Sequence, residues 1–292
     1  MGKKIRQSGI LYVVPALAMV ALVMLYPLVY TLIISFFKNT LFMKAPEFFG
    51  IGQYKALLED RYFVGSISQT LVWTFGSVFF QFTLGFAMAL LLHQKFVKGK
   101  TVLRIFLMVP WVLPSVIGSA VWKWMYNADY GIINYVLKTI GVISQNKTWL
   151  SSPDTAMLSV IVVNVWKMFP YVMLMIEAAL QGVSKELKEA AVIDGAGKFE
   201  IFRNVTWPAI APQCYSVLLL MLVWTLNAFT FVYNLTGGGP AHSTEVMAMY
   251  IYKKAFTDFD FGMASAASTI LFVICMLISL IYIRLTKEGD AQ

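Results

Sequence analysis

Six long apolar stretches, separated by short polar segments, dominate this chain. Each is about twenty residues or longer, which is enough for a helix to cross the hydrocarbon core of a bilayer. They cover residues 10–36, 70–93, 103–125, 155–178, 209–235 and 263–284. Hydrophobic residues make up 59% of the 292 residues and charged residues only 13%. A soluble domain could not bury that much apolar surface. The sequence therefore predicts an all-α polytopic membrane protein, with residues 1–292 forming one transmembrane domain.

Basic residues are distributed unequally between the two sides of these spans. One side carries thirteen basic and six acidic residues in short segments, including Lys3, Lys4 and Arg6 near the N-terminus. The other side has longer loops with nine basic and eight acidic residues. Because basic loops stay in the cytoplasm, we expect both termini and residues 183–207 to be cytoplasmic. The net charge of +8 then reflects membrane topology, and no nucleic-acid partner is expected.

The sequence has no pattern that would supply energy or covalent chemistry. Residues Gly99-Lys100-Thr101 resemble the end of a phosphate-binding loop, but Gln94 stands where that loop needs a glycine. His93 and His242 fall on opposite sides of the membrane, so no metal site is expected. We expect no catalytic residues, no metal and no cofactor bound by this chain, which is therefore not expected to be an enzyme.

A short charged segment between the fourth and fifth spans has a helix-turn-helix pattern. It reads EAAVIDGAGKFEIFRNVTWPAIAP over residues 189–212. Residues 186–193 have helix-forming composition, Asp194-Gly195 is a turn signal, and 198–205 is a second helical stretch. Pro208 suits the first turn of the next membrane helix. Such an element suits docking by a soluble partner, and the alternative is an interfacial turn without a partner.

These residues resemble the "EAA" loop of ATP-binding-cassette importer permeases. The family pattern is Glu-Ala-Ala, Asp-Gly-Ala, a hydrophobic residue and two prolines, matched at 189–191, 194–196, Val205, Pro208 and Pro212. In that family the loop is a coupling helix that docks on the ATPase subunit. The resemblance implies a coupling role for Glu189, Ala190, Ala191, Asp194, Gly195, Ala196 and Phe199. It also implies that a partner ATPase hydrolyses the ATP with Mg.

The resemblance extends over nearly the whole chain. The first span, the outer segment 48–70, the stretch VPWVLPSVIGSAVWKWMYNADYGIIN and the loop LTGGGPAHSTE are similar to carbohydrate permeases of the maltose-importer class. That resemblance implies a type I importer permease fold in the cytoplasmic membrane. It further implies a sugar substrate, a second permease subunit forming a heterodimer, two ATP-binding-cassette ATPase subunits and an extracytoplasmic solute-binding protein.

The fourth span contains polar residues at mid-depth. Asn164, Lys167, Met168 and Tyr171 have the spacing of one helix face. An unpaired lysine there costs about 2.5–3.5 kcal/mol, and Pro170 should bend the helix beside it. Together these features indicate a water-accessible cavity. Glu177 is ten residues further on, about 15 Å along the axis, so we do not expect it to neutralise Lys167.

The fifth span has a second face at helical spacing, made by Trp224, Asn227, Phe231 and Asn234. Aromatic rings beside amide groups suit sugars. The resemblance assigns sugar contacts to the fourth and fifth spans and matches best at Tyr171 and Asn227. The alternative is that these polar residues make interhelical hydrogen bonds, worth only about 0.6 kcal/mol each. The loop 237–240 is either a tight turn or a gate that contacts a docked binding protein.

A self-sufficient secondary carrier of small polar solutes is the main competing hypothesis. Such carriers usually have internal repeats and midplane carboxylates for ion coupling. No repeat is evident, and Glu177 lies near the cytoplasmic edge of its span. A structural or assembly protein would not need so specific a docking loop. The sequence therefore favours the importer permease, without naming the sugar.

Overall fold

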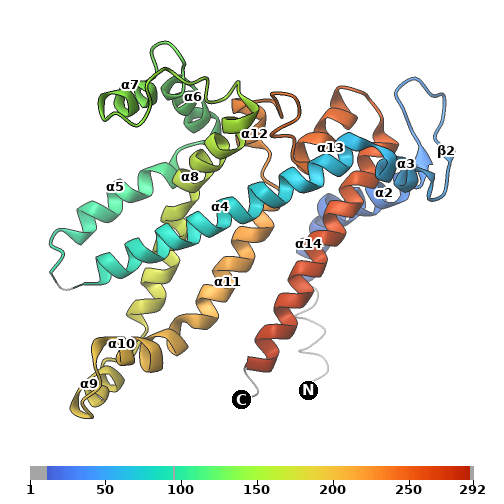
Figure 1. Ribbon diagram of the computed structural model, residues 1–292. Coiled ribbons are helices and arrows are strands. Elements are labelled where there is room, and N and C mark those ends of the chain that lie inside the picture. Colours follow the sequence, from blue (N-terminus) through green and yellow to red (C-terminus); the bar gives the residue numbers. More distant parts are fainter. Residues whose placement is uncertain (1–11, 95, 290–292) are drawn as a thin grey trace, which may run out of the picture. The chain divides into compact units, whose positions relative to one another are not determined.

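The structure is a computed structural model that describes residues 12–94 and 96–289 (Figure 1). Within that part, five helices are long and apolar enough to cross a membrane: Tyr12–Ile34, Arg61–His93, Pro153–Gln181, Lys198–Leu226 and Phe261–Arg284. A bent pair, Lys100–Val112 and Ser115–Met125, makes a sixth crossing if the two helices are counted as one span. The predicted all-α membrane fold is confirmed. Residues 10 and 11 of the first span, and the N-terminal Lys3, Lys4 and Arg6, lie outside the described residues.

The chain forms two compact units, of which the first contains residues up to 64 together with 250–274. Its elements are a π-turn η1 (Ala21–Leu25), α2 (Tyr26–Ile34), the strands β1 (Phe37–Lys38) and β2 (Glu47–Phe48), α3 (Gly52–Glu59), the start of α4 (Arg61–His93), most of α13 (Met247–Phe256) and the first half of α14 (Phe261–Gly289). The α4 helix begins nine residues before the predicted second span. Asp60 explains this start, because its carboxylate accepts the Tyr62 backbone N–H at 2.8 Å and caps the helix.

The second unit contains residues 65–249 and the chain from Cys275 onward. Besides the rest of α4, it holds α5 (Lys100–Val112), α6 (Ser115–Met125), α7 (Ile132–Thr139), α8 (Pro153–Gln181), α9 (Lys185–Ile193), α10 (Lys198–Ile201), a π-turn η2 (Phe202–Thr206), α11 (Trp207–Leu226) and α12 (Thr230–Leu235). Within this unit, α8 packs against α5, α6, α11 and α12 (Figure 1). The α8 helix is therefore the centre of the unit.

The core of the second unit is made by α4, α8 and α11. Its fully buried members include Leu92, Met173, Ile176 and Met221. Gly85 allows α4 to approach α8 closely, because a Cβ added there would lie 2.7 Å from the Val172 Cβ. Small residues permit such close approach between membrane helices.

Two predicted spans are broken, which corrects their boundaries. The third span bends by 95° between Val112 and Ser115. Leu113 and Pro114 are extended there, with ψ of 136° and 135°, because a proline disfavours helical backbone in the residue before it. The fifth span ends at Leu226 and restarts at Thr230 as α12. At that break the Asn227 side chain donates to its own helix, at 2.8 Å from the Val223 carbonyl oxygen.

Pro208 lies in the first turn of α11, as predicted, and Pro170 lies inside α8. The α8 helix is uninterrupted from Pro153 to Gln181, with Pro170 inside it. The helical stretch predicted over 198–205 is continuous with the fifth span, so Pro208 lies within one helix from Lys198 to Leu226. The short π-helix η2 ends at Thr206, two residues before Pro208, and the Trp207 backbone N–H donates to the Phe202 carbonyl. This wider turn lets the helix continue past a residue that lacks an N–H.

Candidate functional site: a polar cavity and an exposed helix-turn

A cavity of about 320 Å³ lies beside the middle of α8. Its lining comes from α6, α8, the end of α11, the start of α12 and the segment between these last two: Ser115, Asn164, Lys167, Met168, Trp224, Thr225 and residues 227–231. Six of the seven residues predicted to contact substrate are among them. The seventh, Tyr171, lies outside this lining. The structure thus brings the fourth-span and fifth-span residues to one place.

Lys167 is 9% exposed and is the one charged residue of the cavity lining. Its Nζ donates to the carbonyl oxygen of Trp111 at 2.8 Å and to that of Leu113. Both carbonyls belong to the C-terminal end of α5, where helix carbonyls lack intrahelical partners and carry partial negative charge. The ammonium group of Lys167 is therefore bound by backbone carbonyls and not by a carboxylate. Lys167 thus makes interhelical hydrogen bonds, as the alternative hypothesis for these polar residues expects.

Three aromatic rings stand in a row beside the cavity. Tyr171 of α8 stacks on Trp111 of α5 with ring centroids 5.7 Å apart, and it contacts Trp224 of α11 at 5.2 Å. Trp224 also lines the cavity. Tyr171 therefore supports the cavity wall through Trp224 and joins three helices.

The predicted fifth-span face is wrong beyond Asn227, because the helix breaks there. Asn227 is the C-terminal cap of α11, whereas Phe231 belongs to α12. Both still reach the cavity, since the chain turns around it. Asn234 does not line the cavity, and its amide donates to the Ser119 hydroxyl at 3.5 Å.

Five lining residues were missed by sequence reasoning: Ser115, Thr225, Ala228, Phe229 and Thr230. Ser115 enters the site because α6 starts directly after the break. Pro110 and Pro114 were the available signal for that break. Phe229 and Thr230 enter because α11 stops at Leu226, and no glycine or proline marks that stop.

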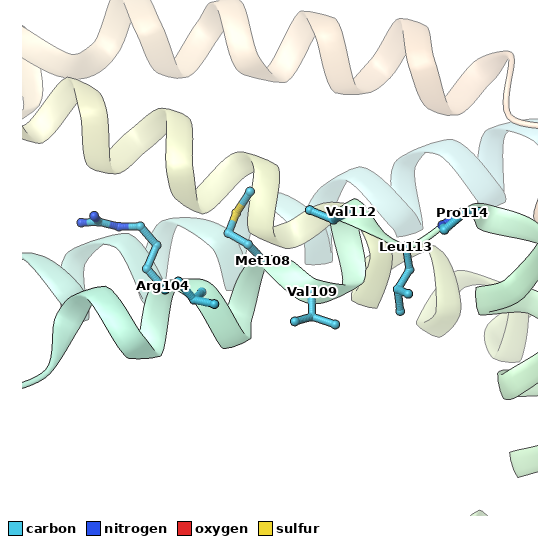
Figure 2. A pocket seen from close by; sticks show the side chains of 7 residues that line it. Arg104, Met108, Val109, Val112, Leu113 and Pro114 are labelled. Carbon is cyan, nitrogen blue, oxygen red and sulfur yellow. The ribbon is translucent and has the colours of Figure 1, made fainter.

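A second groove, of about 510 Å³, follows the surface of α5 and contains Arg104, Ile105, Met108, Val109, Val112, Leu113 and Pro114. Figure 2 shows these side chains arranged along α5 up to the break. All except Arg104 are apolar, and Arg104 pairs with Glu177 of α8 through its Nε at 3.0 Å and through its NH2 group. The expectation that Glu177 does not pair with Lys167 is therefore confirmed. This groove offers few polar groups to a sugar, in contrast to the cavity.

The predicted docking segment is an exposed helix and turn. Ser184 caps α9, accepting the Leu187 backbone N–H at 3.2 Å. The Ser184 hydroxyl also donates to Glu186 at 2.7 Å, and this bond, with the Glu186 backbone N–H, lowers the pKa of that carboxyl. At the start of α10, Glu200 accepts the Gly197 backbone N–H at 2.7 Å. Local hydrogen bonds thus define the segment.

Apolar side chains on this segment face outward. Leu187 is 60% exposed, Ile193 85% and Phe199 73%. Of the predicted coupling residues, Glu189, Ala190, Asp194, Gly195 and Phe199 are exposed, and Ala191 and Ala196 are partly buried. Gly195 has a φ of +82°, and a Cβ there would meet no atom within 4 Å. The glycine is therefore required by backbone conformation and not by close packing within this chain.

The loop after α12 is a tight turn. Gly237 and Gly238 have φ of +61° and +84°, and the Thr244 hydroxyl donates to the Gly239 carbonyl at 2.7 Å. The turn reading of residues 237–240 therefore fits the backbone, and the gate reading stays a prediction.

Long apolar helices, a cavity lined by polar side chains and an exposed helix-turn are together the features of a membrane permease. Residues 81–287 match the family described as the binding-protein-dependent transport system inner membrane component, and the chain belongs to this family.

Two relatives are similar to this chain over nearly its full length. The chain is 33% identical to the trehalose/maltose transport system permease protein of Thermococcus litoralis, over 96% of this chain and 93% of that protein. It is 31% identical to the sulfoquinovosyl glycerol transport system permease protein of Agrobacterium fabrum, over 98% and 92% respectively.

Solved structures share the fold. A chain of a bacterial ABC transporter involved in the import of the acidic polysaccharide alginate matches with a TM-score of 0.84 and 21% identity, over 98% of each chain. A chain of a methionine ABC transporter matches with a TM-score of 0.56 and 18% identity, over 77% of this chain and 94% of that one. The fold is therefore that of ABC importer permeases.

Proposed function

We propose that this chain is the permease subunit of an ATP-driven, binding-protein-dependent importer for a sugar or oligosaccharide. The observation that carries the proposal is the cavity beside α8, where amide, hydroxyl and ammonium groups lie next to aromatic rings. Sugar rings have apolar C–H faces and hydroxyl edges, which such a lining can contact. Relatives named for trehalose/maltose and sulfoquinovosyl glycerol transport support the same substrate class.

The transporter would also contain a second permease, two ATP-binding-cassette ATPase subunits and an extracytoplasmic solute-binding protein. A solved alginate transporter of the same fold is described in complex with its alginate-bound periplasmic protein, which supports a binding-protein partner. In this assembly ATP and Mg would be used by the ATPase subunits, so the chain itself would not be an enzyme. The exposed apolar residues of α9 and α10 would dock on an ATPase subunit.

We place both termini and the α9–α10 segment in the cytoplasm, on the basis of the charge asymmetry of the sequence. The substrate contacts would be made by Asn164, Lys167, Met168, Trp224, Asn227 and Phe231, with Tyr171 supporting Trp224. No observation favours the secondary carrier, because the cavity lining contains no carboxylate for ion coupling.

The test is reconstitution of the chain in proteoliposomes with its second permease, its ATPase and its binding protein. We expect sugar uptake only when all subunits and ATP are present. Uptake by this chain alone, driven by an ion gradient, would support the carrier and contradict the proposal. A panel of neutral and acidic oligosaccharides in the same assay would identify the sugar.

A further inference from the structure

Four buried polar atoms on α4 and α8 have no hydrogen-bond partner in the described part of the chain. They are Thr74 Oγ1, Ser77 Oγ, Gln81 Oε1 and Asn164 Nδ2. All four residues are at most 3% exposed. We call Thr74, Ser77 and Gln81 the polar stripe of α4.

The polar stripe occupies one face in the middle of a membrane helix. Its members are three and four residues apart, which places them on one side of α4. A serine or threonine inside a helix commonly donates to the carbonyl four residues earlier. Thr70 does so, at 2.7 Å from the Ser66 carbonyl oxygen, whereas Thr74 and Ser77 do not. The hydroxyls of the stripe are therefore free to take other partners.

The stripe adjoins the cavity at Gln81, and Trp73 of the same helix, next to the stripe in sequence, also contacts a lining residue. Gln81 Nε2 donates to the Asn164 backbone carbonyl at 3.3 Å. At the other end, Trp73 precedes Thr74, and its Nε1 donates to the Thr225 carbonyl at 2.9 Å. Asn164 and Thr225 both line the cavity. A small displacement of α4 from α8 or α11 would therefore extend the cavity along the stripe.

Unpaired polar atoms in a membrane interior destabilise the fold, and apolar side chains of similar shape would pack there without that penalty. Their presence calls for partners that the described part of the chain does not supply. The unpaired groups are two hydroxyls, one amide oxygen and one amide NH2, so they include both donors and acceptors. Hydroxyl groups match such a set, because each one donates and accepts, whereas a carboxylate only accepts and an ammonium only donates.

We propose that the polar stripe of α4 is a further contact surface for the hydroxyl groups of the transported solute. It becomes part of the pathway when the cavity opens along α4 during transport. This inference rests on the proposed function, and it adds the second span to the helices that recognise the substrate.

The experiment replaces stripe residues by apolar ones in the complete reconstituted transporter, using a sugar that the parent imports. Ser77→Ala should keep the parent melting temperature or raise it, because an unpaired hydroxyl is removed, whereas Gln81→Leu also removes the bond to the Asn164 carbonyl and should lower it slightly. Each should raise the KM for sugar uptake, by about tenfold for Gln81→Leu. Thr70→Val is the matched control, since its hydroxyl is paired, and it should lower the melting temperature.

Ser77→Ala removes only the hydroxyl group. If Gln81→Leu does not assemble, Ser77→Ala alone tests whether the stripe contacts the sugar. A lower Vmax with an unchanged KM would mean that the stripe only holds water, and would contradict sugar contact. So would a melting temperature of Ser77→Ala that falls as far as that of Thr70→Val. A parent that imports no sugar contradicts the proposed function, whereas a transporting parent with unaffected variants contradicts the stripe alone.

Discussion

The ammonium nitrogen of Lys167 lies 2.8 Å from the carbonyl oxygen of Trp111. This bond joins the middle of α8 to the last turn of α5, across 56 residues of sequence. It places a buried positive charge against the negative end of a helix dipole. The break between α5 and α6 is thus held by a side chain from another helix.

Lys167→Met should weaken this junction. Methionine fills a similar volume but donates no hydrogen bond, so the carbonyls of Trp111 and Leu113 lose their partner at a cost of about 1–3 kcal/mol. We expect a lower melting temperature of the purified protein and slower uptake by the reconstituted transporter. Lys167→Arg keeps donors at this position and should retain more of both. Equal losses in the two variants would show that the hydrogen bonds are unimportant.

Glu177→Gln should destabilise the protein. Arg104 would lose its carboxylate partner, and because Arg104 is one-third exposed, we expect about 1–3 kcal/mol, below the range for a fully buried pair. The double variant Arg104→Leu with Glu177→Leu should recover most of that loss, since no unpaired charge remains. Thermal unfolding in detergent measures both. If the double variant is no more stable than Glu177→Gln, the loss does not come from the unpaired arginine.

Gly195→Ala should strain the turn between α9 and α10 by about 1 kcal/mol, because its φ of +82° disfavours any side chain. We expect reduced ATP-driven uptake and weaker retention of the ATPase during purification. Gly197→Ala is the matched control, because Gly197 has a φ of −73°. If both variants behave alike, the left-handed backbone at Gly195 is not needed for docking.

Asn227→Ala should weaken uptake roughly five- to a hundredfold, if one hydrogen bond to a sugar worth about 1–3 kcal/mol is lost. In the structure its amide N–H already donates to the Val223 carbonyl, so the carboxamide oxygen is the group we expect to meet the sugar. Membrane assembly should remain normal. Uptake within twofold of the parent for all tested sugars would make Asn227 a helix-capping residue only.

Cysteine labelling tests the orientation. Lys198 and Thr257 are both exposed, and we expect the α9–α10 segment to be cytoplasmic and the α13–α14 turn to be outside. A membrane-impermeant thiol reagent added from outside should modify Thr257→Cys and not Lys198→Cys. The opposite pattern would reverse the topology and remove the docking proposal. Cys214 and Cys275 should first be replaced, so that only the new thiol reacts.

The apolar runs predicted where the long membrane helices lie because bilayer thickness sets helix length. They did not predict the breaks, because a proline's effect depends on its neighbours. Pro170 lies inside an uninterrupted helix, whereas the chain bends at Pro114. The carbonyls freed beside Pro114 receive the Lys167 ammonium, and one sequence does not reveal such a distant pairing.

The location of the cavity was easier to predict from the sequence than the full set of residues that line it. Helical spacing and the cost of mid-membrane polar groups located Asn164, Lys167 and Met168, since all three lie on one regular helix. Asn234 was misassigned, because the same spacing was extended across the end of α11. The partnership of Arg104 with Glu177 spans 73 residues and has no local signal.

The continuous helix from Lys198 to Leu226 has a mechanical consequence. It begins at the exposed turn and ends at the cavity, and α8 connects the same two places in the opposite direction. Residues 182–197 therefore connect two long helices that both contribute to the cavity wall, α8 through its middle and the helix from Lys198 to Leu226 through its end. A force that displaces residues 182–197 therefore acts on both helices. Through them it acts on the wall of the cavity.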